Sequence, residues 1–224
     1  MNFSDIYQHS LSDKQAFWGE QAKRIYWHKP PQQILDDTKL PFAKWYVGGE
    51  TNLCYNCVDR HLEDRAEQDA YIWVSTEINQ EMVENYPNII DSFKKLGDKV
   101  ELYNDYAKCR LTYNQLYKEV NYFADVLQRQ GITKGDRVII YMPMIVEAAI
   151  AMLACVRIGA IHSVVFGGFA PQNLAVRMDD AEAKMIITAD AGLRGGKLIN
   201  YHQLVKNAVE IATVNPESVI LVNR

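Results

Sequence analysis

Short β-branched runs alternate with helix-like segments over the second half of the chain, and this alternation constrains the fold more than any other feature. The runs expected to form strands are 137–141, 161–165, 184–189 and 218–222. The helices expected before and between them are 112–131, 145–158, 171–180 and 198–213. Strands that alternate with helices pair in parallel through right-handed crossovers, and nearly continuous apolar strands are typical of a sheet covered on both faces. The sequence therefore predicts an α/β fold, a βαβ parallel sheet with helices on both faces.

Composition divides the chain into three segments, with the clearest change near residue 110. Residues 1–68 are rich in Trp, Tyr, Pro and Lys and are interpreted as a helical amino-terminal segment. Residues 69–110 are expected to hold short strands around a polar and acidic insertion at 76–98, which is helical or irregular. Residues 111–224 carry the alternating pattern and form the βαβ subdomain.

Periodicity and turn residues predict the elements of the first two segments. Two helices are expected at 13–26 and 53–65, because apolar residues recur there at turn-like spacing and glycine or proline pairs bound them. Two short strands are expected at 70–74 and 100–103.

Charge and hydropathy exclude several classes of partner. The formal net charge of −4 disfavours a general affinity for nucleic acid or an anionic membrane. The amino terminus lacks the basic start and apolar core of a signal peptide, and no apolar run approaches the roughly 20 residues that a membrane span requires. We therefore expect a cytoplasmic protein with neither nucleic acid nor membrane as partner.

A Cys-x-x-Cys pair, Cys54 and Cys57, precedes His61 by one helical turn. A structural metal site would need four ligands, and no second pair lies nearby. A redox motif would need a strand before the pair, whereas here the pair lies inside an expected helix. Helix packing is the favoured interpretation, and no metal site is predicted.

Two glycine-rich turns each follow a β-branched run directly. They read Phe166-Gly167-Gly168-Phe169 and Arg194-Gly195-Gly196-Lys197. Glycine pairs let a ligand approach the backbone, aromatic faces stack a base, and an Arg/Lys pair holds phosphate. This combination indicates a nucleotide-like ligand at the carboxyl edge of the sheet, although a plain strand-end turn and a solvated loop remain open alternatives. His162, in an apolar strand, is interpreted as a core histidine, and no catalytic residue is predicted.

Long runs of the sequence resemble the acetyl-CoA synthetase branch of the adenylate-forming ligases. In the second half these runs are Tyr141–Met144, Glu147-Ala148, Met152–Cys155 and Arg157–Phe169. In the first half they are Phe17-Trp18, Trp45-Tyr46, Gly48-Gly49, Asn52 and Asp59-Arg60. Within that branch, Ala189–Lys197 is similar to the propionate–CoA ligase subfamily. The resemblance covers nearly the whole chain and implies the amino-terminal part of the adenylate-forming ligase fold.

The resemblance also implies a reaction in two steps. A carboxylate attacks the α-phosphate of Mg-ATP to give an acyl-adenylate, and the thiol of CoA then attacks the acyl carbonyl and releases AMP. The acid would be propionate, with acetate as the alternative. The Ser/Thr-rich phosphate loop and the catalytic Lys of the family have no counterpart in this sequence, so the ATP and Mg²⁺ sites are expected to lie mostly outside it. The chain would then be an incomplete, inactive amino-terminal third that works with the remainder of the same enzyme.

Part of the CoA site is what the resemblance assigns to this chain. Phe166 and Arg194 would flank the adenine of CoA. The backbone of Gly167 and Gly168 would line the pantetheine tunnel, and residues 194–197 would hold the phosphates. A non-catalytic CoA- or nucleotide-binding module is the alternative of another class. A dinucleotide dehydrogenase is disfavoured, because the Gly-Gly turn lacks the Gly-x-Gly-x-x-Gly spacing.

Overall fold

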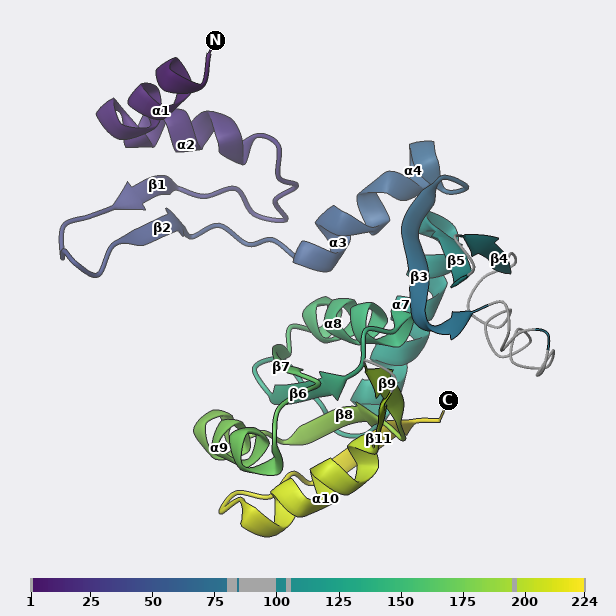
Figure 1. The fold of residues 1–224 in the computed structure, drawn as a ribbon. Coiled ribbons are helices and arrows are strands. Elements are labelled where there is room, and N and C mark those ends of the chain that lie inside the picture. The colour runs from purple at the N-terminus through teal and green to yellow at the C-terminus, as the bar shows by residue number, and fades with distance from the viewer. Residues whose placement is uncertain (1, 80–83, 85–99, 104–105, 195–196, 224) are drawn as a thin grey trace. The chain divides into compact units, whose positions relative to one another are not determined.

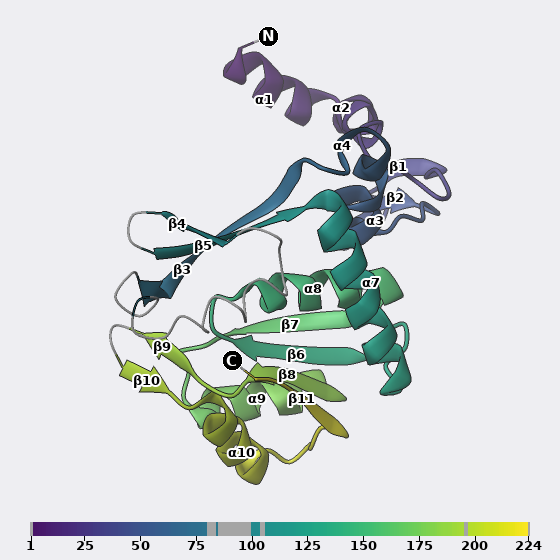
Figure 2. The ribbon, with the colours of Figure 1, turned by 90° about the vertical axis from the view of Figure 1, so that its right-hand side faces the viewer.

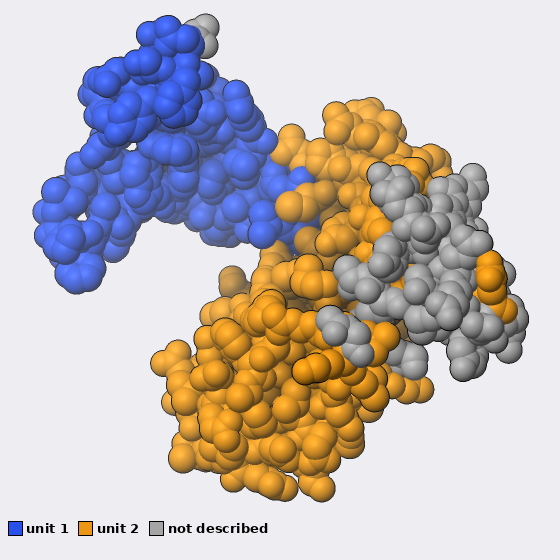
Figure 3. All heavy atoms as spheres, viewed as in Figure 1, with its two compact units in different colours: residues 1–56 blue, residues 57–224 orange. Residues whose placement is uncertain are grey.

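A computed structural model describes residues 2–79, 84, 100–103, 106–194 and 197–223 of the chain. The chain consists of two compact units, residues 1–56 and 57–224, which Figure 1 shows as ribbons and Figure 3 as space-filling surfaces.

The first unit contains helices α1 (Phe3–Ser12) and α2 (Lys14–Ala22) and an antiparallel hairpin of β1 (Gln33–Asp36) and β2 (Lys44–Val47). The helix expected at 13–26 therefore begins correctly and ends early. It ends because the carbonyl of Ala22 accepts from the Trp27 indole at 2.9 Å, while the backbone N–H of Tyr26 donates to the Asn56 side chain at 2.8 Å. These tertiary bonds take the groups that another helical turn would use.

Helix α1 and the hairpin were not predicted for this segment, which we had interpreted as helical. No residue of α1 is buried. Phe3, Ile6, Tyr7 and Leu11 nevertheless recur at helical spacing, and this signal in the sequence was missed. The start of α1 is fixed by a capping box between Asn2 and Asp5. The hairpin strands are four residues each, too short for an alternating pattern to stand out.

The helix expected at 53–65 is present but broken. It comprises α3 (Leu53–Cys57), a 3-10 turn η1 (Asp59–His61) and α4 (Leu62–Arg65). Helix α3 begins where Asn52 accepts a hydrogen bond from the N–H of Tyr55 at 3.1 Å. The break falls at Val58, whose φ of −125° and ψ of −67° are not helical.

The second unit has a three-stranded antiparallel sheet in the order β3-β5-β4, from β3 (Asp69–Asn79), β4 (Val100–Tyr103) and β5 (Tyr106–Thr112). Both expected strands of this region are confirmed, although β3 extends five residues beyond the predicted end at 74, to Asn79. Most of the polar insertion predicted at 76–98 lies outside the described residues.

A four-stranded parallel sheet in the order β11-β8-β6-β7 forms the rest of this unit. Its strands are β6 (Arg137–Met142), β7 (Ile161–Phe166), β8 (Met185–Ala189) and β11 (Ser218–Val222). The helices are α7 (Tyr113–Arg129), α8 (Val146–Ile158), α9 (Pro171–Ala181) and α10 (Tyr201–Ile211). The predicted α/β class and parallel sheet are confirmed.

Helices cover both faces of the parallel sheet, as Figures 1 and 2 show together. Helices α9 and α10 pack on one face, and α8, which packs against α7, covers the other. The core under α9 and α10 includes Ile139, Tyr141, Val165, Leu174, Met178, Ile186, Tyr201 and Val205.

One expected helix begins later than its pattern indicates. Residues 198–213 were predicted as helical, but Lys197–Ile199 forms strand β10, which pairs with β9 (Gly192–Arg194). Helix α10 begins only where Asn200 accepts from the N–H of Gln203 at 2.9 Å. The hairpin keeps these residues extended and places them beside the carboxyl edge of the parallel sheet (Figure 2).

Candidate functional site at the carboxyl edge of the parallel sheet

The order of the strands makes the carboxyl edge between β6 and β8 a natural binding place. From β6 the chain crosses to β7 on one side, whereas from β8 it continues to β11 on the other. Ligands of open α/β sheets bind where neighbouring strands lead away in opposite directions. The first glycine-rich turn directly follows β7, and the residues that flank the second glycine pair end β9 (Arg194) and begin β10 (Lys197).

The turn after β7 presents an aromatic ring to solvent. The N–H of Phe169 donates to the carbonyl of Phe166 at 3.0 Å, which closes the turn over Gly167 and Gly168. The two phenyl rings pack edge to face, with centroids 5.6 Å apart and planes at 73°. Phe166 is 56% exposed, so this ring offers a face to a ligand.

The structure leaves no room for a side chain at Gly167 or Gly168 unless neighbouring atoms move. Neither Gly167 nor Gly168 has a left-handed φ. A Cβ on Gly167 would overlap the Tyr201 hydroxyl and lie 2.9 Å from the carbonyl oxygen of Met142, and a Cβ on Gly168 would overlap the Arg194 guanidinium. The turn therefore packs against its surroundings so closely that a side chain cannot be added without moving them.

Arg194 connects the two turns. It ends β9, and its guanidinium carbon lies 4.6 Å from the centroid of the Phe166 ring, a cation–π contact. Lys197 opens β10 directly opposite Arg194 in the hairpin register, and both side chains are exposed. Gly195 and Gly196, the two glycines between them, lie outside the described residues.

The structure thus brings Phe166, Gly168 and Arg194 into one cluster and places Lys197 beside it. The stacked pair leaves no room for a base between ring and guanidinium, because two van der Waals contacts of about 3.5 Å each would require a separation of roughly 7 Å. A planar ligand could stack on the face of Phe166 that Arg194 covers only after the guanidinium has moved away.

Sequence reasoning missed the residues that support the turn. Tyr141, fully buried in β6, donates from its hydroxyl to the carbonyl of Phe169 at 2.7 Å. Burial, and secondarily Tyr201 with its ring centroid 5.2 Å away, raises the pKa of Tyr141 to about 12, so the hydroxyl stays protonated as a donor. Arg177 of α9 stacks on the Phe169 ring at 4.8 Å. The sequence did contain a signal for the role of Tyr141, because it is the one aromatic residue in the mainly aliphatic strand β6.

His162 and the cysteines give no sign of catalytic or metal chemistry. Burial lowers the pKa of His162, which favours the neutral ring at pH 7. Cys54 is buried and Cys57 is exposed, and neither forms a disulfide. In the part of the chain that the structure describes, no group of three or more His, Cys, Asp or Glu side chains could hold a metal ion. Among the same residues, no helix has both the length and the apolarity to cross a bilayer.

The chain matches two sequence families, one over most of each unit. Residues 91–223 match the family described as AMP-binding enzyme, and residues 3–57 match the acetyl-coenzyme A synthetase N-terminus. The second match ends where the structure separates its two units.

Curated relatives resemble this chain over its whole length. It is 45% identical over 224 residues to a propionate–CoA ligase of Salmonella typhimurium, covering 100% of this chain and 31% of the relative. It is also 45% identical over 212 residues to an acetyl-coenzyme A synthetase of Mesorhizobium japonicum, covering 93% of this chain and 28% of that relative. The chain therefore spans less than a third of the length of the relatives it matches.

A solved structure shares the fold. Acetoacetyl-CoA synthetase from Streptomyces lividans superposes with a TM-score of 0.78 at 20% identity, covering 100% of this chain and 30% of that structure.

Proposed function

This chain belongs to the AMP-binding enzyme family, and on that premise we propose that it is the amino-terminal part of an AMP-forming short-chain acyl-CoA ligase. The enzyme would join a carboxylic acid to CoA through an acyl-adenylate, with release of pyrophosphate and then AMP. The observation that carries the proposal is the cluster at the carboxyl edge, where an exposed ring, a bare Gly-Gly backbone and a guanidinium converge.

Each group of the cluster has a property suited to CoA. The Phe166 ring, which is 56% exposed, is suited to stacking on the adenine base once Arg194 has moved off its face. The backbone at Gly167 and Gly168 lets a narrow pantetheine arm pass close to the chain, and Arg194 and Lys197 supply the charge that a phosphate-bearing ligand needs. ATP and Mg²⁺, which supply the activated phosphate when bound, would be held mostly by residues outside this chain.

The contact of Arg194 with Phe166 gives the proposed site a closed state. Because that contact occupies the stacking face at 4.6 Å, binding of CoA would cost the cation–π contact and would be repaid by stacking of the base. The adenine would then take the place of the guanidinium on the ring, and Arg194 would turn towards the phosphates.

Propionate is the proposed acid, and acetate is the alternative. The segment Ala189–Lys197 and the match to propionate–CoA ligases over the entire chain support propionate. The acetyl-coenzyme A synthetases reach similar identities, so the relatives alone do not decide the acyl group. We place the enzyme in the cytoplasm, where cysteines that form no disulfide, such as Cys54 and Cys57, stay reduced.

The test is to express the full-length reading frame that contains this chain and to measure its two half-reactions. The acids compared would be acetate, propionate and butyrate. We expect acid-dependent ATP–pyrophosphate exchange without CoA, and acyl-CoA formation only when CoA is added, with the highest kcat/KM for propionate. CoA binding with no exchange for any acid would instead favour a non-catalytic CoA-binding module.

A further inference from the structure

Phe169 fixes the position of the Phe166 ring. Its N–H donates to the carbonyl of Phe166 and closes the turn. Its ring packs edge to face with the Phe166 ring, with centroids 5.6 Å apart. A shift of Phe169 therefore moves both the ring and the backbone at Gly167 and Gly168. Whatever holds Phe169 also sets the shape of the surface proposed to receive CoA.

Two side chains from different elements hold Phe169. The Tyr141 hydroxyl, from the carboxyl end of β6, donates to its carbonyl at 2.7 Å. The Arg177 guanidinium, from α9, lies 4.8 Å from the centroid of its ring. Arg177 is itself tied to its helix, because Nη1 donates to the carbonyl of Asn173 at 2.9 Å.

Packing alone does not account for the Tyr141 hydroxyl. The side chain is fully buried in a strand whose neighbours Ile139 and Ile140 are apolar, and a phenylalanine would fill nearly the same volume. A buried hydroxyl must be hydrogen-bonded to be tolerated, and this one is aimed at the backbone of the turn. The hydrogen bond to Phe169 compensates for the cost of burying this hydroxyl and fixes the position of Phe169.

We propose that Tyr141 and Arg177 are positioning residues for CoA recognition. Tyr141 holds Phe169 through a hydrogen bond and Arg177 holds it through a cation–π contact, and both thereby orient Phe166 and the Gly-Gly backbone. The inference rests on the proposed function, because it assigns a role within the same site. Neither side chain touches the ligand in this proposal, and both act through Phe169.

The test uses the full-length protein carrying Tyr141→Phe or Arg177→Met. Loss of one hydrogen bond should raise the KM for CoA about three- to tenfold, and loss of the cation–π contact about two- to fivefold. We expect acid-dependent ATP–pyrophosphate exchange to stay within about twofold, because it takes place without CoA. We expect kcat at saturating CoA to stay within about twofold as well, because the lost contacts contribute equally to binding in the ground state and the transition state. Equal loss in both half-reactions would indicate general structural damage and would overturn the inference.

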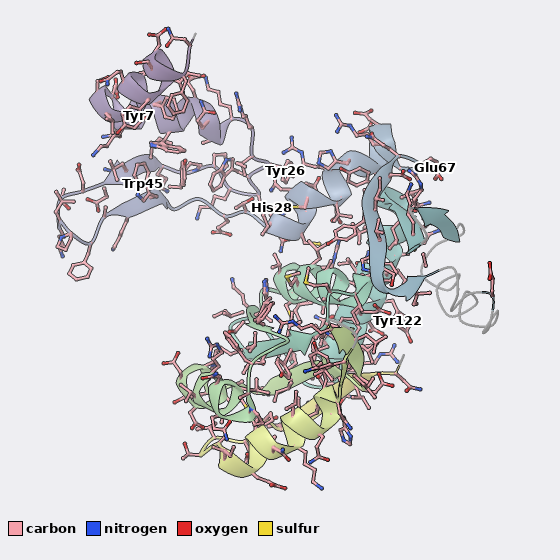
Figure 4. All side chains as sticks on the ribbon, in the orientation of Figure 1. Tyr7, Tyr26, His28, Trp45, Glu67 and Tyr122 are labelled. Atoms are coloured by element: carbon pink, nitrogen blue, oxygen red, sulfur yellow. The ribbon has the colours of Figure 1, made fainter. Side chains whose placement is uncertain are left out.

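Matched controls lie on α7. Tyr122→Phe removes a hydroxyl from a side chain that is 69% exposed, and Arg129→Met removes a guanidinium whose exposed ion pair with Asp125 spans 2.8 Å. Figure 4 labels Tyr122. Both controls should leave the KM for CoA unchanged. A rise equal to that of Tyr141→Phe or Arg177→Met would show that the effect is not specific to the turn.

A double-mutant cycle with Phe166→Ala separates the inference from the function on which it rests. If Tyr141 and Arg177 act through Phe166, their substitutions should change the KM for CoA much less in the Phe166→Ala background than in the wild type. Full persistence of their effects in that background would overturn the positioning role while leaving the CoA site intact. If Phe166→Ala alone left CoA affinity unchanged, the proposed site itself would be wrong.

Discussion

A single methyl group at Gly168 would compete with the Arg194 guanidinium for the same space. We predict that Gly168→Ala raises the KM for CoA of the full-length enzyme about tenfold or more, because the added methyl group fills space beside the backbone that is proposed to receive the pantetheine arm. Steady-state kinetics with varied CoA would measure this. Gly19→Ala is the matched control, since its Cβ would meet only Ile34 at an ordinary 3.5 Å, and we expect the KM to be unaltered.

Charge and planarity at Arg194 can be separated by two substitutions. Arg194→Ala should raise the KM for CoA and spare adenylate formation, since the side chain lies in the proposed CoA cluster and the ATP site is proposed to lie elsewhere. Arg194→Lys should recover only part of the loss, because an ammonium group supplies a point charge without the planar fork that binds two phosphate oxygens at once. Initial rates of both half-reactions would check this, and an equal decline of the two in Arg194→Ala would contradict it.

At the scale of elements, an ion pair holds η1 against α8. Arg157 donates to both carboxylate oxygens of Asp59, at 3.0 and 2.6 Å, and its guanidinium also lies 5.3 Å from the Tyr117 ring. The two side chains are only 20% and 15% exposed. Removing one partner would leave a partly buried charge without its counterion.

We therefore predict that Asp59→Ala lowers the free energy of unfolding by about 2–3 kcal/mol, somewhat less than for a fully buried pair. Urea denaturation followed by circular dichroism would measure it. Glu20→Ala removes a pair in which both side chains are more than 60% exposed, and it should cost at most about 0.5 kcal/mol. A loss for Asp59→Ala as small as that of the control would show that the pair does not stabilise the unit.

The loop between α7 and β6 contributes to the stability of the fold in a pH-dependent way. Asp136 accepts from the N–H and the hydroxyl of Thr133, at 2.7 and 2.9 Å, and pairs with Lys184 at 3.2 Å. The Thr133 N–H is the main cause that lowers the pKa of this carboxyl below its ordinary value of 3.8. A lowered pKa in the folded state means that the charged form stabilises the fold at pH values above 3.8, and that this stabilisation is lost as the pH falls below it.

Asp136→Asn should consequently be less stable than the wild type at pH 7. The difference should shrink as the pH is lowered towards 3.8 and below, because the wild-type carboxyl then becomes protonated. Urea midpoints measured at a series of pH values would follow this convergence. A difference that stays constant across the series would mean that the charge of Asp136 is not what stabilises the loop.

The sequence predicted the parallel sheet well because its signals are local. Thr112 caps α7 with Gln115, as expected for that start, and each sheet strand is an apolar run bounded by turn residues. The β9–β10 hairpin was missed because three-residue strands carry no periodicity. The support of the turn by Tyr141 and Arg177 was also missed. Tyr141 is 28 residues from Phe169, and the contact of Arg177 with Phe169 depends on how α9 packs beside the turn.

In the whole molecule, the border between the two units coincides with the end of a sequence family match. The match to the acetyl-coenzyme A synthetase N-terminus ends at residue 57, and the structure separates its units after Asn56. The first unit is thus both a sequence module and a structural one, whereas the second carries the proposed CoA cluster. Since the relatives are more than three times as long as this chain, most of the proposed enzyme would lie outside these 224 residues.

Strand β11 forms one edge of the parallel sheet, where a further strand could pair. Strand β11 pairs with β8 on one side, and within the described residues no strand pairs with its other side. Val219 and Leu221 of this strand are each 44% exposed. An unpaired edge strand with apolar side chains is a template for association between chains.

We predict opposite effects of Val219→Lys in two contexts. In the 224-residue chain expressed alone, the added charge should reduce self-association, as measured by light scattering after gel filtration, because lysine protects an exposed edge. In the full-length enzyme the same substitution should lower the thermal midpoint, because further strands would then cover the edge and bury the charge. Glu217→Lys, just before the strand, is the control for added charge outside the edge. A full-length enzyme indifferent to Val219→Lys would show that β11 remains the border of the sheet in the complete molecule.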